Sequence, residues 1–367
     1  MIPTRAAIAD GNGGFSIDTV DVGQPAAGEV LVEIRAAGLC HTDHASLRWK
    51  RPLVMGHEGA GVVRSVGEGV GSVRVGDRVV LNWAIPCGHC PSCRRGDEVL
   101  CRTSRPAHVL ERSAGHAHAE GTRWRGAPID RSFNLGTLCG LALVRQEAVT
   151  VLPGGIPWTS ACIVGCGVMT GFGSAVNVAR VQPGDTVAVI GCGGVGLNVI
   201  QGARLCGAAR IVAVDSVPAA LERARKFGAT DVVLARRDDA NLDAAAAEVR
   251  RLLGGHGADH AFEATAVPAL AFAPLGMIRD GGMALQVSGI NDPVTVEMPR
   301  FMWNKTYVTP LYGGCRPARD FPRIFAHYLA GELLLDELVT RTYPLDALGE
   351  AFDDLLAGRI AKGVLLP

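Results

Sequence analysis

Short apolar runs separated by glycine, proline and aspartate dominate the first third of the chain. Residues 29–36, 61–66 and 78–81 are such runs, and they are rich in β-branched side chains. Runs of about four to eight residues with this composition predict β-strands bounded by turns. We therefore expect the first third of the chain to be β-rich.

After about residue 165 the pattern changes, and apolar strand-like runs alternate with helix-like segments. The predicted strands are residues 186–190, 210–214, 231–234, 259–263 and 283–287. The predicted helices between them are residues 195–206, 219–227 and 242–253. This alternation is typical of a parallel sheet with helices on both faces. From about residue 311 we expect a helix, a strand and a second helix, so the predicted fold class is α/β with a separate β-rich part.

Length and charge limit the classes of protein that this chain can be. Its 367 residues are 48% hydrophobic, which suggests two or three domain-sized units with ample core. The 36 basic residues balance 36 acidic ones, so charge gives no reason to expect nucleic acid or an anionic membrane as partner. The first ten residues show no signal-peptide pattern, and no apolar stretch approaches membrane-spanning length. Eleven cysteines in this setting indicate metal ligation in a reducing cytoplasm.

Four of these cysteines form the most specific pattern in the chain, at Cys87, Cys90, Cys93 and Cys101. Thiolates at this spacing suit tetrahedral Zn²⁺, and the glycines and proline between them let the backbone wrap the ion. The alternative is a disulfide pair. An all-cysteine zinc site has no open position, so this lobe is expected to stabilise the fold and to perform no chemistry.

A glycine-rich turn marks a candidate dinucleotide site. It consists of Gly191, Cys192, Gly193, Gly194, Val195 and Gly196, between a predicted strand and a predicted helix. Asp215 ends the next strand, 19 residues after Gly196, as the dinucleotide fingerprint requires. Its carboxylate would bind the ribose hydroxyls and repel a 2′-phosphate, and Ser216 and Val217 supply no arginine for that phosphate. NAD is therefore favoured over NADP, the alternative being a purely structural strand–turn–helix.

Three further motifs contain potential metal ligands: Gly-Leu-Cys-His-Thr-Asp at 38–43, Gly-His-Glu-Gly at 56–59 and Gly-Cys-Gly at 165–167. A buried cysteine is more often a packing residue than a ligand. The residues alone therefore leave open whether Cys40, His57 and Cys166 act together.

In combination, these motifs resemble those of the zinc-dependent alcohol dehydrogenases of the medium-chain dehydrogenase/reductase superfamily. The resemblance runs from about residue 30 to the C-terminus, and residues 81–83 and 164–170 are similar to bacterial thiol-dependent formaldehyde dehydrogenases. It implies a GroES-like catalytic domain at residues 1–167 and 311–367, with a Rossmann NAD-binding domain inserted at residues 168–310. It also implies a homodimer or homotetramer, with residues 306–311 as an intersubunit strand.

The same resemblance assigns roles to individual residues. Cys40, His57 and Cys166 would hold a catalytic zinc, whose fourth position takes water or the substrate oxygen. Thr42 would accept the substrate proton, and Asp43 would orient the histidine ligand. Glu58 matches an acid behind the zinc that ligates transiently, and a satisfied buried carboxylate is the alternative. Thr170 matches a residue near the nicotinamide, while His41 and Lys362 match positions that contact the pyrophosphate.

The chain also departs from the family pattern. Ala45 stands where many members have a histidine that completes the proton relay, and His44 is one residue earlier. Residues 45–54 leave little room for the loop at the substrate entrance, and acidic residues for glutathione recognition are not recognisable. Trp83 occupies a pocket-lining aromatic position. His116 and His118, with Arg112, Arg123 and Arg125, are expected to form a solvated loop, and the other five cysteines, Cys139, Cys162, Cys192, Cys206 and Cys315, to be packing residues.

The expected activity is zinc-dependent hydride transfer between a primary or secondary alcohol, or its aldehyde or ketone, and NAD. A thiol-adduct formaldehyde dehydrogenase is the alternative within oxidoreductases. A non-catalytic protein on the same scaffold is the alternative from another class, and loss of a ligand at Cys40, His57 or Cys166 would favour it.

Overall fold

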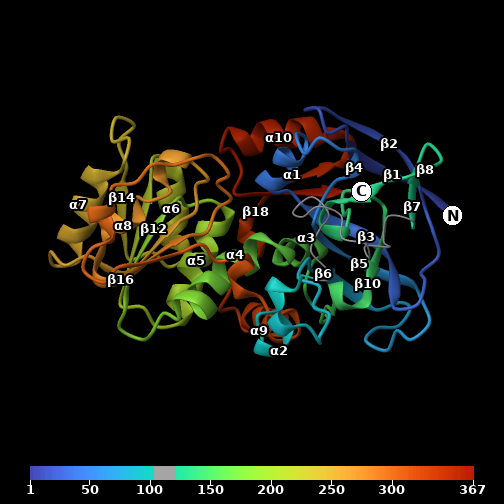
Figure 1. Cartoon of the computed structure of the whole chain (residues 1–367), viewed down its shortest axis with the longest axis horizontal. Helices are drawn as coiled ribbons and strands as arrows, with labels where there is room; N and C mark the ends of the chain where they lie inside the picture. Colours follow the sequence, from blue (N-terminus) through green and yellow to red (C-terminus); the bar gives the residue numbers. More distant parts are fainter. Residues whose placement is uncertain (103–120) are drawn as a thin grey trace. The chain divides into compact units, whose positions relative to one another are not determined.

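The computed structural model describes residues 1–102 and 121–367, which divide into two compact units (Figure 1). The first unit is Met1–Cys166 with Arg316–Pro367, and the second is Gly167–Cys315. Arg112, His116 and His118 lie outside the described residues. The expected domain boundaries, after residues 167 and 310, stay a prediction.

The first unit is built from two sheets. A seven-stranded sheet has the order β11-β6-β5-β3-β19-β18, with β10 also paired to β3, and a six-stranded sheet has the order β8-β7-β2-β1-β4-β9. The strands of the first sheet are β3 (Glu29–Gly38), β5 (Glu58–Val66), β6 (Arg78–Leu81), β10 (Leu141–Arg145), β11 (Val149–Val151), β18 (Val339–Pro344) and β19 (Lys362–Leu366). Those of the second are β1 (Ile2–Ala9), β2 (Phe15–Val22), β4 (Leu53–Val54), β7 (Thr122–Trp124), β8 (Ala127–Pro128) and β9 (Asp130–Arg131).

Short helices connect these strands. They are α1 (His41–Ser46), α2 (Pro91–Arg95), α3 (Trp158–Cys162), α9 (Pro317–Leu329) and α10 (Leu348–Leu356). The helix, strand and helix expected after residue 311 are α9, β18 and α10. The final strand β19 was not predicted, and it pairs with both β18 and β3. The C-terminal segment thereby places Lys362 beside the segment that carries Cys40.

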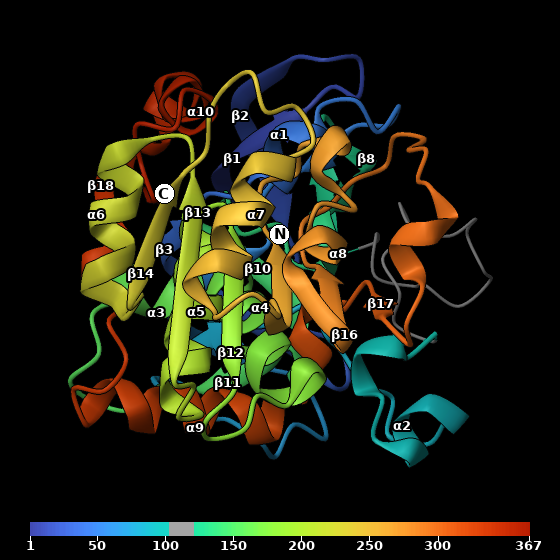
Figure 2. The ribbon, with the colours of Figure 1, turned by 90° about the vertical axis from the view of Figure 1, so that its left-hand side faces the viewer.

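The second unit is a six-stranded parallel sheet in the order β14-β13-β12-β15-β16-β17, as the alternating pattern predicted. The strands are β12 (Thr186–Ile190), β13 (Arg210–Asp215), β14 (Asp231–Leu234), β15 (Ala258–Glu263), β16 (Ile278–Gln286) and β17 (Thr306–Val308). The helices are α4 (Gly167–Gly173), α5 (Gly194–Leu205), α6 (Pro218–Phe227), α7 (Asp243–Leu252) and α8 (Pro274–Met277). Figure 2 shows β12, β13 and β14 side by side.

The core of the second unit follows from the alternation of side chains along buried parallel strands. Ala188, Ile190, Val212 and Val214 point to one face of the sheet, where α7 and α8 contribute apolar side chains to the same core. Helices α5 and α6 contact β13 as well. The sheet is thus held in place by apolar packing.

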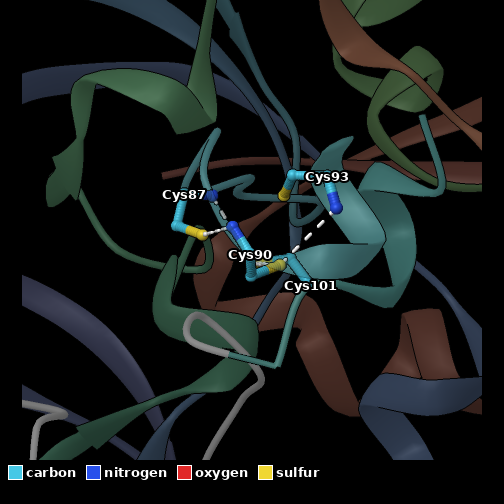
Figure 3. Close-up of side chains that lie close together, drawn as sticks. All are labelled: Cys87, Cys90, Cys93 and Cys101. Carbon is cyan, nitrogen blue, oxygen red and sulfur yellow. Dashed lines mark hydrogen bonds between the residues drawn. The ribbon is translucent and has the colours of Figure 1, made fainter. Parts of the chain in front are cut away.

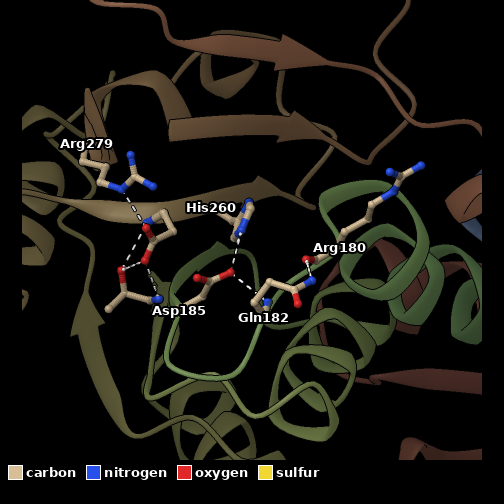
Figure 4. Close-up of polar contacts among 7 residues, drawn as sticks. Arg180, Gln182, Asp185, His260 and Arg279 are labelled. Atoms are coloured by element: carbon tan, nitrogen blue, oxygen red, sulfur yellow. Dashed lines mark hydrogen bonds and ion pairs between the residues drawn. The ribbon is translucent and has the colours of Figure 1, made fainter. Parts of the chain in front are cut away.

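A polar network ties the amino ends of β12 and β15 together (Figure 4). Asp185 Oδ2 lies 3.1 Å from His260 Nε2, and Asp259 Oδ2 accepts hydrogen bonds from the amide and the hydroxyl of Thr186. Arg279 donates to the other oxygen of Asp259. These contacts lie at the amino ends of the strands, whereas nucleotides bind at the carboxyl ends.

Among the described residues, no single helix is both long enough and apolar enough to span a membrane. One bent pair of helical segments, Trp158–Gly165 and Gly167–Ala179, reaches that length and apolar composition when the two are taken together.

Candidate metal centres and dinucleotide site

The four cysteines of the first motif converge around α2 (Figure 3). Their sulfur atoms all lie within 4.8 Å of one another, and Cys90 Sγ is 3.9 Å from Cys101 Sγ. Zn–S bonds of about 2.3 Å would place tetrahedral sulfurs roughly 3.8 Å apart. None of the eleven cysteines, all of which lie in the described residues, is in a disulfide, so the structure does not have the alternative of a disulfide pair.

The backbone of this lobe is folded to present sulfur to a cation. Amide groups of Cys87, Cys90 and Cys93 donate to the sulfurs of Cys101, Cys87 and Cys90 at 3.4–3.5 Å. Burial raises the pKa of the Cys93 thiol to about 12. The donor set therefore fits a metal ion, whose charge would hold the sulfurs as thiolates.

Arg316 fastens the lobe to the C-terminal segment of the same unit. Its Nε donates to the carbonyl of Gly96 at 2.6 Å, and its amide donates to Asp320 in the first turn of α9. Gly96 ends α2 with φ 83°, and a Cβ there would lie 1.9 Å from the guanidinium of Arg316. Only glycine suits both the left-handed backbone and this close approach.

The second cluster consists of Cys40, His57, Glu58 and Cys166, whose ligand atoms also lie within 4.8 Å of one another. Cys40 is the N-cap of α1. Glu58 is the first residue of β5, and His57 directly precedes it. Cys166 is the last residue of the first unit before the chain enters the second. Gly38 pairs with Glu58 across β3 and β5, and a Cβ at Gly38 would overlap the Glu58 carboxylate. The structure thus brings together the three motifs that the residues alone left unconnected.

Asp43 organises two members of this cluster. Its Oδ1 lies 2.9 Å from His57 Nδ1, and its Oδ2 accepts the amide hydrogen of Cys40 at 2.9 Å. Since an ionised carboxylate only accepts, Nδ1 carries a proton and Nε2 is directed to the cluster as the ligand atom. Both Asp43 and His57 are fully buried, so the imidazole orientation is fixed.

The cluster favours positive charge. Burial alone would lower the pKa of His57, but Asp43 and Cys40 outweigh it and raise the pKa well above its ordinary value. A hydrogen bond from Cys166 lowers the pKa of the Cys40 thiol, and the same bond raises the pKa of Cys166. A bound cation would supply the charge that holds both sulfurs as thiolates.

Glu58 is the buried carboxylate of the cluster. Lys362 Nζ donates to its Oε1 at 2.6 Å and to the carbonyl of Leu39 at 3.1 Å. Burial raises the pKa of Glu58 to about 7, against the lowering effect of Lys362. Glu58 Oε2 is buried and accepts no hydrogen bond from the described residues. This oxygen is therefore available to a metal ion, whereas the predicted contact of Lys362 with the pyrophosphate stays a prediction.

The predicted proton-relay residues lie on α1. Thr42 is half-buried, and His41 and Ala45 are exposed. The ring of His44 packs edge-on against Phe352 of α10, with ring centroids 5.3 Å apart. Burial, with the charges of Arg48 and His41, lowers the pKa of His44. His44 is therefore occupied by a packing contact.

Sequence reasoning missed Phe133, although this residue contacts the metal cluster. Its ring lies 4.7 Å from that of His57 and 5.2 Å from that of Trp83, between centroids. Phe133 and Asn134 have φ of 52° and 60°, in the left-handed region. That conformation costs roughly 1–2 kcal/mol for a residue with a Cβ, although asparagine tolerates it. The composition of the segment does not indicate this contact, because the position of the Phe133 ring depends on the left-handed backbone conformation.

The dinucleotide motif in the second unit has the geometry that the fingerprint predicts. Gly191 has φ 88°, and a Cβ on this residue would lie 2.7 Å from the methyl carbon of Thr265. A Cβ on Gly196 would lie 1.8 Å from the carbonyl oxygen of Gly191. Gly193 is the N-cap of α5, and a Cβ there would meet none of the described residues within 4 Å. Helix α5 begins with Gly194 and Val195, so its free amides border open space beside Gly193.

Asp215 at the end of β13 closes this turn. Its Oδ2 accepts the amide hydrogen of Cys192 at 2.8 Å, and its Oδ1 accepts that of Val217 at 2.9 Å. A carboxylate has about four lone-pair sites, so capacity remains for ribose hydroxyls. Thr170 lies half-buried on α4, which packs against α5 in the same unit. The motif therefore fits a dinucleotide whose pyrophosphate meets the N-terminus of α5.

Two family models match the chain. The alcohol dehydrogenase GroES-like domain matches residues 26–154, and the zinc-binding dehydrogenase model matches residues 194–329. Over 381 residues the chain is 36% identical to putative alcohol dehydrogenase D of Mycobacterium tuberculosis, covering 100% of both. Over 374 residues it is 33% identical to the S-(hydroxymethyl)glutathione dehydrogenase of Escherichia coli, covering 99% of each.

Solved structures agree with these matches. An alcohol dehydrogenase zinc-binding domain protein from Burkholderia ambifaria is 32% identical with a TM-score of 0.89, and the benzyl alcohol dehydrogenase of Acinetobacter calcoaceticus is 27% identical with a TM-score of 0.88. Each match covers 100% of this chain and 99% of the other. The chain therefore belongs to the zinc-dependent alcohol dehydrogenases of the medium-chain dehydrogenase/reductase superfamily, oxidoreductases that act on small alcohols or aldehydes with zinc and NAD as cofactors.

Proposed function

We propose that the chain binds two zinc ions with different tasks. The four-cysteine lobe around α2 holds a structural ion, and Cys40, His57 and Cys166 hold a catalytic ion with an open fourth position. Glu58, through its unpaired Oε2, is the transient fourth ligand. The observation that carries this proposal is the convergence of these four ligand atoms within 4.8 Å, in surroundings that favour positive charge.

The residues of the catalytic cluster then have distinct roles in alcohol oxidation. When bound, zinc supplies a Lewis acid for the alcohol oxygen, and NAD accepts the hydride. Thr42 takes the hydroxyl proton and passes it towards solvent. Asp43 keeps Nε2 of His57 aimed at the ion through the 2.9 Å contact with Nδ1. Lys362 holds Glu58 in place by its buried ion pair.

The dinucleotide motif provides the cofactor contacts. Asp215 binds the ribose hydroxyls and disfavours a 2′-phosphate, which makes NAD the preferred cofactor. The open space beside Gly193 and the N-terminus of α5 take the pyrophosphate. His41 and Lys362 are proposed as further pyrophosphate contacts, and Thr170 as a residue near the nicotinamide.

We also propose that the chain forms a homodimer or homotetramer through the edge of the parallel sheet. β17 is an edge strand, and unpaired strand edges are sites of association. Exposed apolar side chains precede and follow it, and Trp303 and Met298 are 69% and 72% exposed. Pairing of β17 across a two-fold axis would cover them. A cytoplasmic location agrees with the eleven cysteines, none of which is in a disulfide.

Formation of NADH from a panel of primary and secondary alcohols, monitored by absorbance, tests the activity. We expect turnover with simple alcohols and NAD in the absence of any thiol. The 33% identity to S-(hydroxymethyl)glutathione dehydrogenase makes thiol-adduct oxidation the second candidate. Turnover that requires both formaldehyde and a low-molecular-weight thiol would favour that candidate. Absence of turnover with every substrate would favour a non-catalytic protein.

A further inference from the structure

We propose that Glu263 is a positioning residue of the cofactor site and that its buried charge favours the oxidised over the reduced form of NAD. This inference rests on the proposed binding of NAD at the glycine-rich turn of the second unit, and it concerns the other half of that site. The carrying observation is a fully buried carboxylate at the carboxyl end of β15, whose hydrogen-bond donors are all uncharged.

The topology of the parallel sheet places Glu263 on the nicotinamide side of the cofactor site. The strand order β14-β13-β12-β15-β16-β17 is that of a doubly wound sheet, in which each half binds one mononucleotide of a dinucleotide. Asp215, proposed for the adenosine ribose, ends β13 in the first half. Glu263 ends β15, the first strand of the second half, and pairs with Ile190, the residue before the glycine-rich turn. The nicotinamide mononucleotide therefore belongs to the half that contains Glu263.

The carboxylate of Glu263 holds the turn that follows β15. Its Oε1 accepts hydrogen bonds from the amide and the hydroxyl of Thr265, both at 2.5 Å, and from the amide of Ala266 at 3.1 Å. Ala266 has φ 61°, a left-handed conformation that a residue with a Cβ rarely adopts. Strained residues persist where surrounding contacts fix them, so Glu263 helps to set the shape of this turn.

Glu263 also reaches the ends of the two neighbouring strands. Its Oε2 accepts a hydrogen bond from the hydroxyl of Ser288, just beyond β16. The amide of Val287 donates to the Glu263 carbonyl at 2.9 Å, and the amide of Ala264 donates to the carbonyl of Ile190 at 2.8 Å. The contacts of this one residue thus connect the ends of β12, β15 and β16 at the carboxyl edge of the sheet, where a dinucleotide binds.

No cation among the described residues neutralises the charge of Glu263. Its donors are two backbone amides and two hydroxyls, and no lysine, arginine or histidine in the part of the chain that the structure describes forms an ion pair with it. Three donors on one oxygen suit an ionised carboxylate, which only accepts hydrogen bonds. Little solvent screens a buried charge. The nicotinamide ring is cationic in NAD⁺ and neutral in NADH, so the charge stabilises the oxidised form selectively.

The test compares the dissociation constants of NAD⁺ and NADH for the parent and for Glu263→Gln on the zinc-loaded enzyme. Binding of NADH is followed by its fluorescence, and binding of NAD⁺ by competition with NADH. Glutamine keeps the shape, because its carbonyl oxygen can accept the three bonds of Oε1 and its amide can donate to the hydroxyl of Ser288.

We expect Glu263→Gln to lose affinity for NAD⁺ about tenfold relative to NADH. Unit charges about 10 Å apart, at an effective dielectric constant of about 20, change an equilibrium constant by an amount on the order of tenfold. Glu263→Asp keeps the charge and should keep the parental ratio of the two dissociation constants. Equal losses for both forms in Glu263→Gln, or no loss for either, would overturn the proposal. A parent that binds neither form would count against the proposed cofactor site itself.

Asp259→Asn is the matched control on the same strand. Asp259 lies near the amino end of β15, where it accepts two hydrogen bonds from Thr186 at 2.8 Å and one from Arg279 at 2.6 Å. It is paired with a cation and lies at the edge of the sheet opposite to the cofactor site, so Asp259→Asn should keep the parental ratio of the two dissociation constants.

A second variant tests the charge where Glu263→Gln does not fold. Ser288→Lys places an ammonium group next to the Glu263 carboxylate at a half-buried position and should neutralise its effect. We expect the affinity for NAD⁺ relative to NADH to fall, as in Glu263→Gln. An unchanged ratio in Ser288→Lys would contradict the proposal.

Discussion

Replacement of Asp43 by alanine should weaken zinc binding at the Cys40, His57 and Cys166 cluster without affecting the four-cysteine lobe. The buried carboxylate makes two hydrogen bonds of 2.9 Å, one with His57 Nδ1 and one with the amide of Cys40. Loss of such a partner of a metal-bound histidine costs about 10- to 100-fold in metal affinity, or about 1.4–2.7 kcal/mol. Loss of the bond to Cys40, at the start of α1, removes about a further 1 kcal/mol of folding stability.

Competition with a chelator measures this effect, because the two ions of each chain should leave in separate phases. In Asp43→Ala only one phase should shift, and the ion in the four-cysteine lobe serves as the internal reference. Chemical unfolding of the same variant measures the smaller loss of stability.

Asp239→Ala is the matched control for helix capping. Asp239 accepts the amide hydrogens of Ala244 and Ala245 at the start of α7, far along the chain from either metal cluster. This variant should lose about 1 kcal/mol of stability and keep both zinc affinities. If Asp43→Ala lost stability as Asp239→Ala does and bound both ions as the parent does, Asp43 would be a helix cap and nothing more.

The remaining predictions concern other parts of the chain. Cys93→Ser should lose several kcal/mol of stability, measured by thermal unfolding, because structural zinc in peptides binds with about 10–16 kcal/mol; unchanged stability with lost catalysis would reverse the two zinc roles. Thr42→Ala should lower the oxidation rate by about 10²–10⁴-fold, whereas His44→Ala should change it by less than about tenfold; collapse of the rate in His44→Ala, with zinc content and NAD affinity intact, would identify His44 as the relay. Asp215→Gly combined with Ser216→Arg should shift the kcat/KM ratio from NAD towards NADP, and a parent that prefers NADP would contradict this. Hydrogen bonds from Tyr343 and Arg359 lower the pKa of Asp354 from 3.8 to about 2, so its stabilising effect is present above about pH 4 and is lost as pH falls towards 2. Asp354→Asn should therefore unfold more easily than the parent at pH 7, and the difference in urea midpoints should shrink at pH 3.

Much of the second unit could be predicted from the sequence, because buried parallel strands and the turns between them are encoded locally. The strands at 186–190 and 231–234 were predicted with the bounds of β12 and β14, and the glycine-rich turn was placed at the start of α5. Strand β16 begins at Ile278, earlier than the predicted residue 283. The early part of that strand contains Gly281 and Gly282, which weakened the apolar pattern.

The catalytic cluster was less accessible to sequence reasoning. Cys40, His57 and Cys166 became a candidate set only through the resemblance, since nothing in their local patterns links them. The ion pair between Glu58 and Lys362 joins residues 304 positions apart, and it depends on the unpredicted strand β19. Phe133 was missed because its contact with His57 arises from a left-handed backbone that the composition of the segment does not announce.

The zinc content of the parent and of Cys166→Ser tests the central claim most directly. Cys162→Ser is the control, since Cys162 is buried on α3 and its thiol donates to the carbonyl of Thr159. We predict two zinc ions per chain in the parent and in Cys162→Ser, and one in Cys166→Ser together with loss of NAD-dependent alcohol oxidation. Two ions and full activity in Cys166→Ser, or a single ion in an active parent, would contradict the account.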